Sequence, residues 1–223
     1  MKKYSYVGIS FIVLIFGIWV VSEYMSRNSS QELVYVKDNN GEKRKVPDFK
    51  MVNQNKDTIT NESYAGKVYV VEFFFATCPT ICPIMNENLV KVQNEFFGNP
   101  NFGIASFTIN PENDTPEVLK EYAKEHNITH ANWHLLTGDR EKIYKLAKNG
   151  FSLYARENSD EPGGFEHSGY FALIDEEGYI RSRKDEQGNP IIFYDGSTPY
   201  NSKKTNRGKK QIDWLIQDIE KLL

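Results

Sequence analysis

Cysteine is scarce in this chain of 223 residues, which has only two, Cys78 and Cys82, separated by three residues. An iron–sulfur cluster or an all-cysteine zinc site needs four thiolates. The cysteine count therefore excludes both kinds of centre. It leaves one pair of thiols, and the rest of the sequence has to indicate what that pair does.

Positive charge is not in excess either, because 27 Lys and Arg residues stand against 30 Asp and Glu residues, for a net charge of −3. The basic residues are spread along the chain, whereas nucleic-acid-binding proteins present a concentrated basic face. Internal repeats and low-complexity blocks are also absent from the sequence. Nucleic acid is not an expected partner, and a hydrophobic content of 39% suffices for the core of one domain.

The N-terminus carries a long apolar run, in which Lys2 and Lys3 precede a charge-free stretch that ends at Glu23. As a helix, residues 4–22 would span roughly 28 Å, close to a bilayer core of about 30 Å. The pattern predicts a single-pass transmembrane helix with the N-terminus in the cytoplasm and the remainder outside the cell membrane. A cleaved signal peptide is the alternative, although no small-residue cleavage site follows the run. We expect three parts: residues 1–26 as membrane anchor or signal, 27–45 as linker and start of a hairpin, and 46–223 as the functional domain.

The remaining sequence alternates between strand and helix patterns. Residues 67–76, KVYVVEFFFA, form a nearly continuous apolar run that is typical of a strand buried on both faces. Residues 84–97 then place apolar side chains at helical spacing. Further segments extend the alternation: a hairpin within 32–54, strands at 101–110, 133–138, 163–183 and 191–196, and helices at 114–127, 139–151 and 209–223. This order predicts an α/β domain with partly parallel strands.

The two cysteines fall where the first central strand is followed by its helix, at the carboxyl edge of the predicted sheet. Open α/β sheets carry their chemistry at this edge. Three interpretations stay open for Cys78 and Cys82: a structural disulfide, a redox-active pair or two metal ligands. A loop this short would stabilise the fold little, and most thioredoxin-like oxidoreductases use C-x-x-C rather than C-x-x-x-C.

A histidine could be the third ligand of a metal site that includes Cys78 and Cys82. Two thiolates and one imidazole would make a three-coordinate site suited to copper. Among the four histidines, His126 and His130 lie in polar company and are expected at the surface, and His134 lies in a predicted strand. His167 follows a Gly-Gly loop at the start of a strand, so a flexible loop could carry it towards the cysteines.

Three segments, FFFATCPTICPIM, TINPENDTPEVLKEYA and EHSGYFALIDEEG, resemble the Sco/SenC family in the same order. The resemblance runs from about Phe49 to the C-terminus. It implies a thioredoxin-like α/β fold with an N-terminal β-hairpin extension and a single N-terminal transmembrane helix. It also implies that Cys78, Cys82 and His167 bind one copper ion.

The same resemblance implies a metallochaperone, not primarily an enzyme, that delivers copper to the dinuclear copper centre of a cytochrome c oxidase. The expected partner is the copper-bearing oxidase subunit, with other copper chaperones or thiol reductases acting on the same pair. The chain departs from the family pattern at Thr80, Asn110 and Glu166, where acidic or Asp residues are usual. These departures change the charge around the ligands, so copper(I) is expected rather than copper(II).

The alternative function is a thiol–disulfide oxidoreductase that reduces the oxidase's copper-ligand cysteines or acts in redox signalling. It would use Cys78 and Cys82 as a redox-active pair and would not need His167. A peroxiredoxin is the nearest rival within the fold. It would need a Thr three residues before the reactive cysteine, where this chain has Phe75.

Overall fold

The computed structural model describes residues 10, 12–21, 33–158, 162–185, 187–203, 205 and 207–223. The side chains of four strand residues also lie outside the description: Ala155, Glu157, Glu166 and His167. The chain divides into two compact units, residues 1–32 and Leu33–Leu223. The second unit contains every strand in the part of the chain that the structure describes.

The described residues do not contain the predicted N-terminal transmembrane helix, and this part of the fold prediction is wrong. Residues 12–21 are helical, which corresponds to a length of only about 15 Å against a bilayer core of about 30 Å. Among the described residues, no helix is both long enough and apolar enough to cross a membrane. Residues 4–9, 11 and 22 of the predicted span lie outside the described residues.

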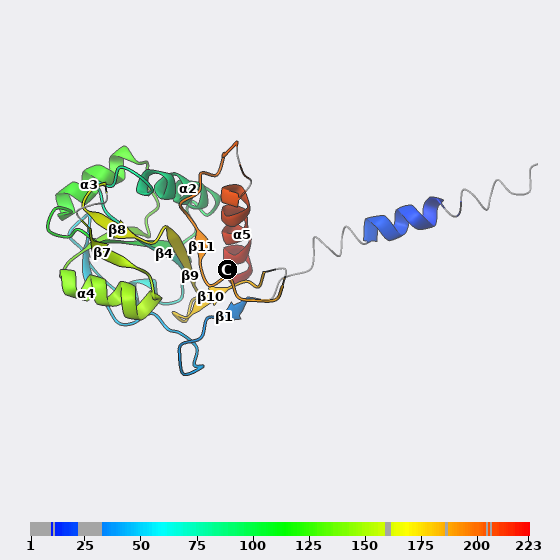
Figure 1. Cartoon of the computed structure of the whole chain (residues 1–223), viewed down its shortest axis with the longest axis horizontal. Coiled ribbons are helices and arrows are strands. Elements are labelled where there is room, and N and C mark those ends of the chain that lie inside the picture. The colour runs from blue at the N-terminus through cyan, green and yellow to red at the C-terminus, as the bar shows by residue number, and fades with distance from the viewer. Residues whose placement is uncertain are drawn as a thin grey trace, which may run out of the picture. The chain divides into compact units, whose positions relative to one another are not determined.

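A mixed β-sheet of nine strands forms the centre of the second unit (Figure 1). Eight strands follow the order β1-β10-β9-β4-β5-β6-β2-β3, and β11 pairs with β9. Their bounds are β1 Val34–Tyr35, β2 Lys50–Asn53, β3 Thr58–Thr60, β4 Val68–Phe74, β5 Phe102–Thr108, β6 Trp133–Thr137, β9 Tyr170–Ile174, β10 Ile180–Ser182 and β11 Tyr194–Asp195. The central strands β4, β5 and β6 are parallel, while β9 runs antiparallel to β4. The predicted α/β domain with partly parallel strands is therefore confirmed.

Helices cover both faces of this sheet. Their bounds are η1 Asn61–Tyr64, α2 Cys82–Glu95, α3 Pro116–Glu125, α4 Arg140–Lys145, the π-helix η2 Leu146–Gly150 and α5 Arg207–Leu222. Adjacent residues of a strand point to opposite faces, and in β4 the ring of Phe74 packs on Tyr122 of α3 whereas that of Phe73 packs on Phe151, just after η2. Figure 1 shows α2 near α3 and α5, and α4 apart from them.

The segments next to the main sheet also pair. An antiparallel bridge joins Lys37 to Lys43 around the turn at Asn39 and Asn40, within the predicted N-terminal hairpin. A separate two-stranded sheet consists of β7 Ala155–Glu157 and β8 Phe165–His167. This hairpin interrupts the chain just before β9 and carries His167.

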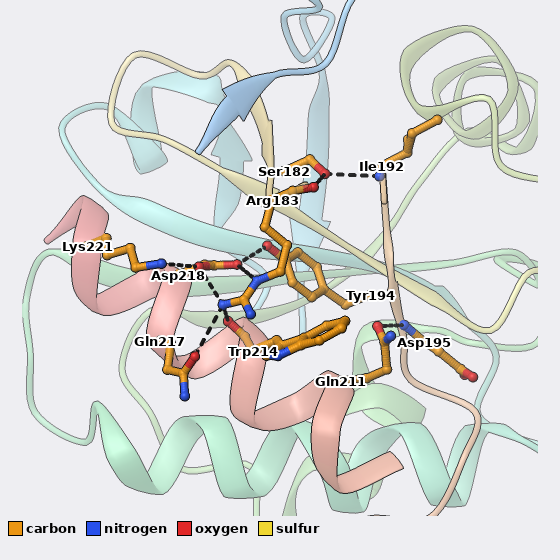
Figure 2. A network of polar contacts seen from close by, with 10 residues as sticks. All are labelled: Ser182, Arg183, Ile192, Tyr194, Asp195, Gln211, Trp214, Gln217, Asp218 and Lys221. Atoms are coloured by element: carbon orange, nitrogen blue, oxygen red, sulfur yellow. Dashed lines mark hydrogen bonds and ion pairs between the residues drawn. The ribbon is translucent and has the colours of Figure 1, made fainter. Parts of the chain in front are cut away.

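A buried ion pair attaches α5 to the sheet (Figure 2). Arg183, which follows β10, donates from Nε to Oδ2 of Asp218 at 2.6 Å and from Nη2 to Oδ1 at 2.8 Å. Tyr194 of β11 donates to the same carboxylate at 2.7 Å, and Lys221 donates at 3.0 Å. Asp218 is fully buried. The positive charges of Arg183 and Lys221 compensate its charge, and Tyr194 adds a neutral hydrogen bond.

His130 corrects one expectation about the histidines. Its polar sequence neighbours predict a surface position, but its side chain is buried, and its ring contacts those of Phe97 and Phe102. The side-chain oxygen Oε1 of Gln93 in α2 accepts hydrogen bonds from the backbone N–H groups of Thr129 and His130 at 2.8 and 2.9 Å. Hydrogen bonds to a glutamine of α2 therefore hold the polar segment around His130 against the protein.

Candidate metal centre

Both cysteines lie in the connection between β4 and α2. The Cys78 N–H donates to the Phe75 carbonyl at 3.2 Å, which turns the chain directly after the strand. Cys82 is the first residue of α2 and Pro83 follows it. A proline suits the first helical turn because its missing N–H would find no partner within the helix. The sequence therefore starts the helix at the second cysteine.

The first backbone N–H of α2 brings the two cysteines together. The Cys82 N–H donates to Sγ of Cys78 at 3.5 Å, and Oγ1 of Thr80 lies 3.6 Å from the same sulfur. The structure holds both residues as thiols, with 7% of Cys78 and 2% of Cys82 exposed. Both residues are therefore buried, and Cys78 is the slightly more exposed of the two.

The electrostatic environment differs from what a helix N-terminus alone would predict. Burial, followed by the contact with Cys78, raises the pKa of the Cys82 thiol far above its ordinary value, and the charge of Glu72 raises it further. The helix dipole favours the thiolate, but desolvation outweighs it at Cys82. Burial therefore favours the neutral thiol form of Cys82.

His167 lies in β8, with Ala155 of β7 as its backbone partner. Its side chain is outside the described residues, but the residues before it contact the cysteine loop. The ring of Phe165 packs on that of Phe75 with centroids 5.2 Å apart. Gly163 lies so close to the same ring that an added Cβ would be 2.8 Å from it and 3.2 Å from Cδ of Pro79.

The chain on the C-terminal side of His167 is held just as closely. A Cβ added to Gly169 would lie 3.3 Å from Cδ1 of Ile81, the residue before the second cysteine. Ser168 exchanges hydrogen bonds with Tyr154, whose N–H donates to Oγ of Ser168 at 3.0 Å. Packing contacts on both sides of His167 thus lead to residues near the two cysteines, Phe75 and Pro79 on one side and Ile81 on the other.

The sequence places Asp114 only at the start of the predicted helix 114–127, but the structure brings it to the cysteine loop. Its buried carboxylate accepts the Ala76 N–H at 2.9 Å and the hydroxyl of Thr108, while the α3 cap is Thr115. β5 runs parallel to β4, so the loop after β5 meets the cysteine loop at one sheet edge. An acidic residue after the neighbouring parallel strand was the available signal.

Glu72 is the second residue whose role the sequence did not predict. It is buried in the middle of β4 and accepts a hydrogen bond from Oγ of Ser106 at 2.7 Å. Oγ of Ser106 in turn accepts a hydrogen bond from Nε1 of Trp133 at 3.0 Å. Burial and then the Glu72 charge raise the pKa of Tyr122. A single charge within an otherwise apolar strand run was the visible signal for this network.

The donor set at the sheet edge fits a soft metal ion. Within the described residues, no group of three or more His, Cys, Asp and Glu side chains could hold a metal ion, and the side chain of His167 is not among them. Two adjacent thiols with a histidine-bearing strand held beside them provide sulfur and nitrogen donors, which soft ions prefer. The assignment of Cys78, Cys82 and His167 as ligands stays a prediction.

A thiol pair at the carboxyl edge of a thioredoxin-like sheet, with an inserted β-hairpin beside it, defines the class of this protein. A family model described as SCO1/SenC matches residues 37–196. The chain belongs to this family, which confirms the resemblance noted in the sequence. The SCO1 protein homolog of Bacillus subtilis is 31% identical over 152 residues, which cover 67% of this chain and 77% of that protein.

Solved structures share the fold. A SCO1/SenC family lipoprotein from Bacillus anthracis has a TM-score of 0.66 and 27% identity, covering 80% of this chain and 95% of that one. BsSco, described as a Sco family cytochrome c oxidase assembly protein with a disulfide switch, has a TM-score of 0.63 and 27% identity, with coverages of 79% and 92%. Bradyrhizobium japonicum ScoI, solved with copper bound, has a TM-score of 0.58 and 19% identity, with coverages of 79% and 98%.

Proposed function

We propose that this protein is a copper-binding metallochaperone that takes copper(I) as its cargo and delivers it to the dinuclear copper centre of a cytochrome c oxidase. Cys78 and Cys82 would supply two thiolates and His167 an imidazole. The observation that carries the proposal is the Cys82 N–H donated to Sγ of Cys78 at 3.5 Å, beside the strand that bears His167. The family and the copper-bound relative support it.

The residues around the pair would each have a part in loading and release. Asp114 fixes the start of the cysteine loop through Ala76, and Cys82 must lose its proton before its sulfur can bind the metal. Cys78 is the more exposed of the two residues. The protein would pass its cargo through Cys78 first, as a donor from the copper-bearing oxidase subunit replaces one ligand after another.

Copper(I) titration of the purified full chain against a chromophoric chelator tests this function. We expect one copper ion per chain, and His167→Ala should weaken binding by at least tenfold because one of three donors is lost. His126→Ala is the matched control, since His126 stacks on Tyr122 at the end of α3. A wild-type stoichiometry far below one, or equal affinities in the His167→Ala variant and the wild type, would refute the proposal.

The same thiol pair supports a second function, reduction of a partner's disulfide. Cys78 would attack one sulfur of the partner's disulfide and release the other as a thiol, which forms a mixed disulfide. Cys82 would then attack the Cys78 sulfur and release the first partner sulfur, leaving a Cys78–Cys82 disulfide and two partner thiols. The contact between the cysteines and the disulfide switch described for BsSco favour this role. Oxidase assembly in cells that carry His167→Ala separates the two functions, because only the copper-delivery role requires the imidazole.

We further propose that the domain works outside the cytoplasm. Lys2 and Lys3 before the apolar run support this placement, as does the description of the Bacillus anthracis relative as a lipoprotein. A thiol reagent that does not cross membranes should label Cys78 in intact cells. Labelling only after lysis would place the domain inside.

A further inference from the structure

The segment of residues 195–200 contacts the chain just after His167. The Gly196 N–H donates to the carbonyl of Gly169 at 2.9 Å. A Cβ added to Gly169 would lie 2.6 Å from Cβ of Ser197, so Gly169 packs tightly against the Ser197 side chain. Since Gly169 comes two residues after His167, the 195–200 segment is a direct support of the chain that carries the predicted nitrogen ligand.

Asn88 of α2 attaches this segment to the helix that begins with Cys82. Its Nδ2 donates to the carbonyls of Gly196 and Thr198 at 2.9 and 3.0 Å, and its Oδ1 accepts the Tyr200 N–H at 3.2 Å. The side chain is 1% exposed. The donors and the acceptor of one buried amide are therefore all used on a single segment.

The 195–200 segment has other contacts that maintain its shape. Asp195 accepts hydrogen bonds from Ser197 and Thr198 and pairs with Arg207 at 2.9 Å. Gln211 of α5 accepts the Asp195 N–H at 3.1 Å, as Figure 2 shows. These contacts lie within the segment or lead to α5, and Asp195 also pairs with Tyr170 of β9. The hydrogen bonds of Asn88 attach the segment to α2, where Lys91 also lies over the Tyr200 ring at 4.9 Å.

We propose that Asn88 is a positioning residue that fixes the strand end bearing His167 relative to the cysteine end of α2. This rests on the proposed copper site, because His167 lies in β8, Cys82 begins α2 and Cys78 lies in the connection directly before α2. Without the amide, Gly196 and Thr198 lose a buried donor, and the contact from Gly196 to Gly169 loosens. The thiols of Cys78 and Cys82 keep their own geometry, so the imidazole contribution is the one that is lost.

The experiment compares Asn88→Ala and the milder Asn88→Ser with Asn86→Ala in the full chain. Asn86 is a matched control because it is also a buried asparagine of α2, and its Nδ2 donates to the His126 carbonyl at 3.3 Å, away from the 195–200 segment. Two readouts are taken at a temperature where all variants are folded. They are amide hydrogen exchange of residues 168–170 without metal, and copper(I) affinity.

We expect exchange at residues 168–170 to accelerate at least tenfold in both Asn88 variants and to stay unchanged in Asn86→Ala. Copper(I) affinity should fall by about tenfold in the Asn88 variants, and adding His167→Ala should cause little further loss. Unchanged exchange in both Asn88 variants overturns the positioning role, whether or not copper binds. Accelerated exchange in the Asn88 variants together with an unchanged copper(I) affinity also overturns the positioning role. If the wild-type protein itself binds no copper(I), the proposed function is refuted instead.

Discussion

The carboxylate of Asp114 holds the backbone N–H of Ala76 at 2.9 Å, two residues before Cys78. The two residues lie in the loops that follow the neighbouring parallel strands β5 and β4. The same carboxylate accepts the Thr108 hydroxyl and, through its other oxygen, the Asn113 amide. One buried charge therefore ties the cysteine loop to the loop that follows the next strand.

Replacing Asp114 with Ala should lower the free energy of unfolding by about 2–4 kcal/mol, because several hydrogen bonds to a buried charged group are lost. Copper(I) affinity should fall as well, since the cysteine loop loses its attachment. Asp139→Ala is the control: this exposed aspartate only caps α4, through the Lys142 N–H at 2.9 Å, and its loss should cost about 1 kcal/mol. Urea unfolding measures both values, and equal losses in the two variants would contradict the assignment.

Replacing Asp218 with Asn should lower the free energy of unfolding by about 3–5 kcal/mol, because it leaves the buried Arg183 without its charge partner (Figure 2). The control is Glu121→Gln, which breaks a pair with Lys124 whose side chains are 60% and 78% exposed. That change should cost less than about 1 kcal/mol. Thermal or urea unfolding checks the contrast, and similar costs would show that the buried pair contributes no more than a surface pair.

Copper(I) affinity should rise with pH. Burial raises the pKa of the Cys82 thiol, so a proton must leave whenever this sulfur binds the metal. Apparent affinities measured across neutral pH should increase with pH in the wild type and increase less steeply in Cys82→Ser. A wild-type affinity that does not depend on pH would mean that Cys82 is not a ligand.

Stability should depend on pH through the buried His130. Burial lowers the pKa of its imidazole, so the unfolded chain takes up this proton more readily than the folded chain. The neutral His130 therefore contributes its full share of the free energy of unfolding above about pH 6.5, the ordinary pKa of histidine. This share is lost as the pH falls below that value. His130→Asn keeps an acceptor for the Asn132 N–H and should flatten the change in unfolding free energy between pH 7 and pH 5. An unchanged slope would contradict this account.

Local sequence patterns were sufficient for the central strands and helices. The apolar run around Val70 predicts β4, and the spacing of Met85, Leu89 and Val92 predicts the buried face of α2, where all three are fully buried. The cysteine position at the sheet edge follows from the same alternation. These features depend on neighbouring residues, so one sequence is enough to reveal them.

The supports of the candidate site could not be predicted in this way. Asn88 meets Gly196 across 108 residues of chain, and Asp114 meets Ala76 across 38. Which polar residue becomes buried depends on how the sheet orders its strands, and local periodicity does not report that order. The same reason applies to His130, whose burial depends on Gln93 of α2.

X-ray absorption at the copper edge of the copper(I)-loaded full chain tests the central claim most directly. The account predicts two sulfur donors and one imidazole nitrogen, with the nitrogen signal lost in His167→Ala and one sulfur lost in Cys78→Ser or Cys82→Ser. A first shell without two sulfurs, or an imidazole signal that persists in His167→Ala, would contradict it.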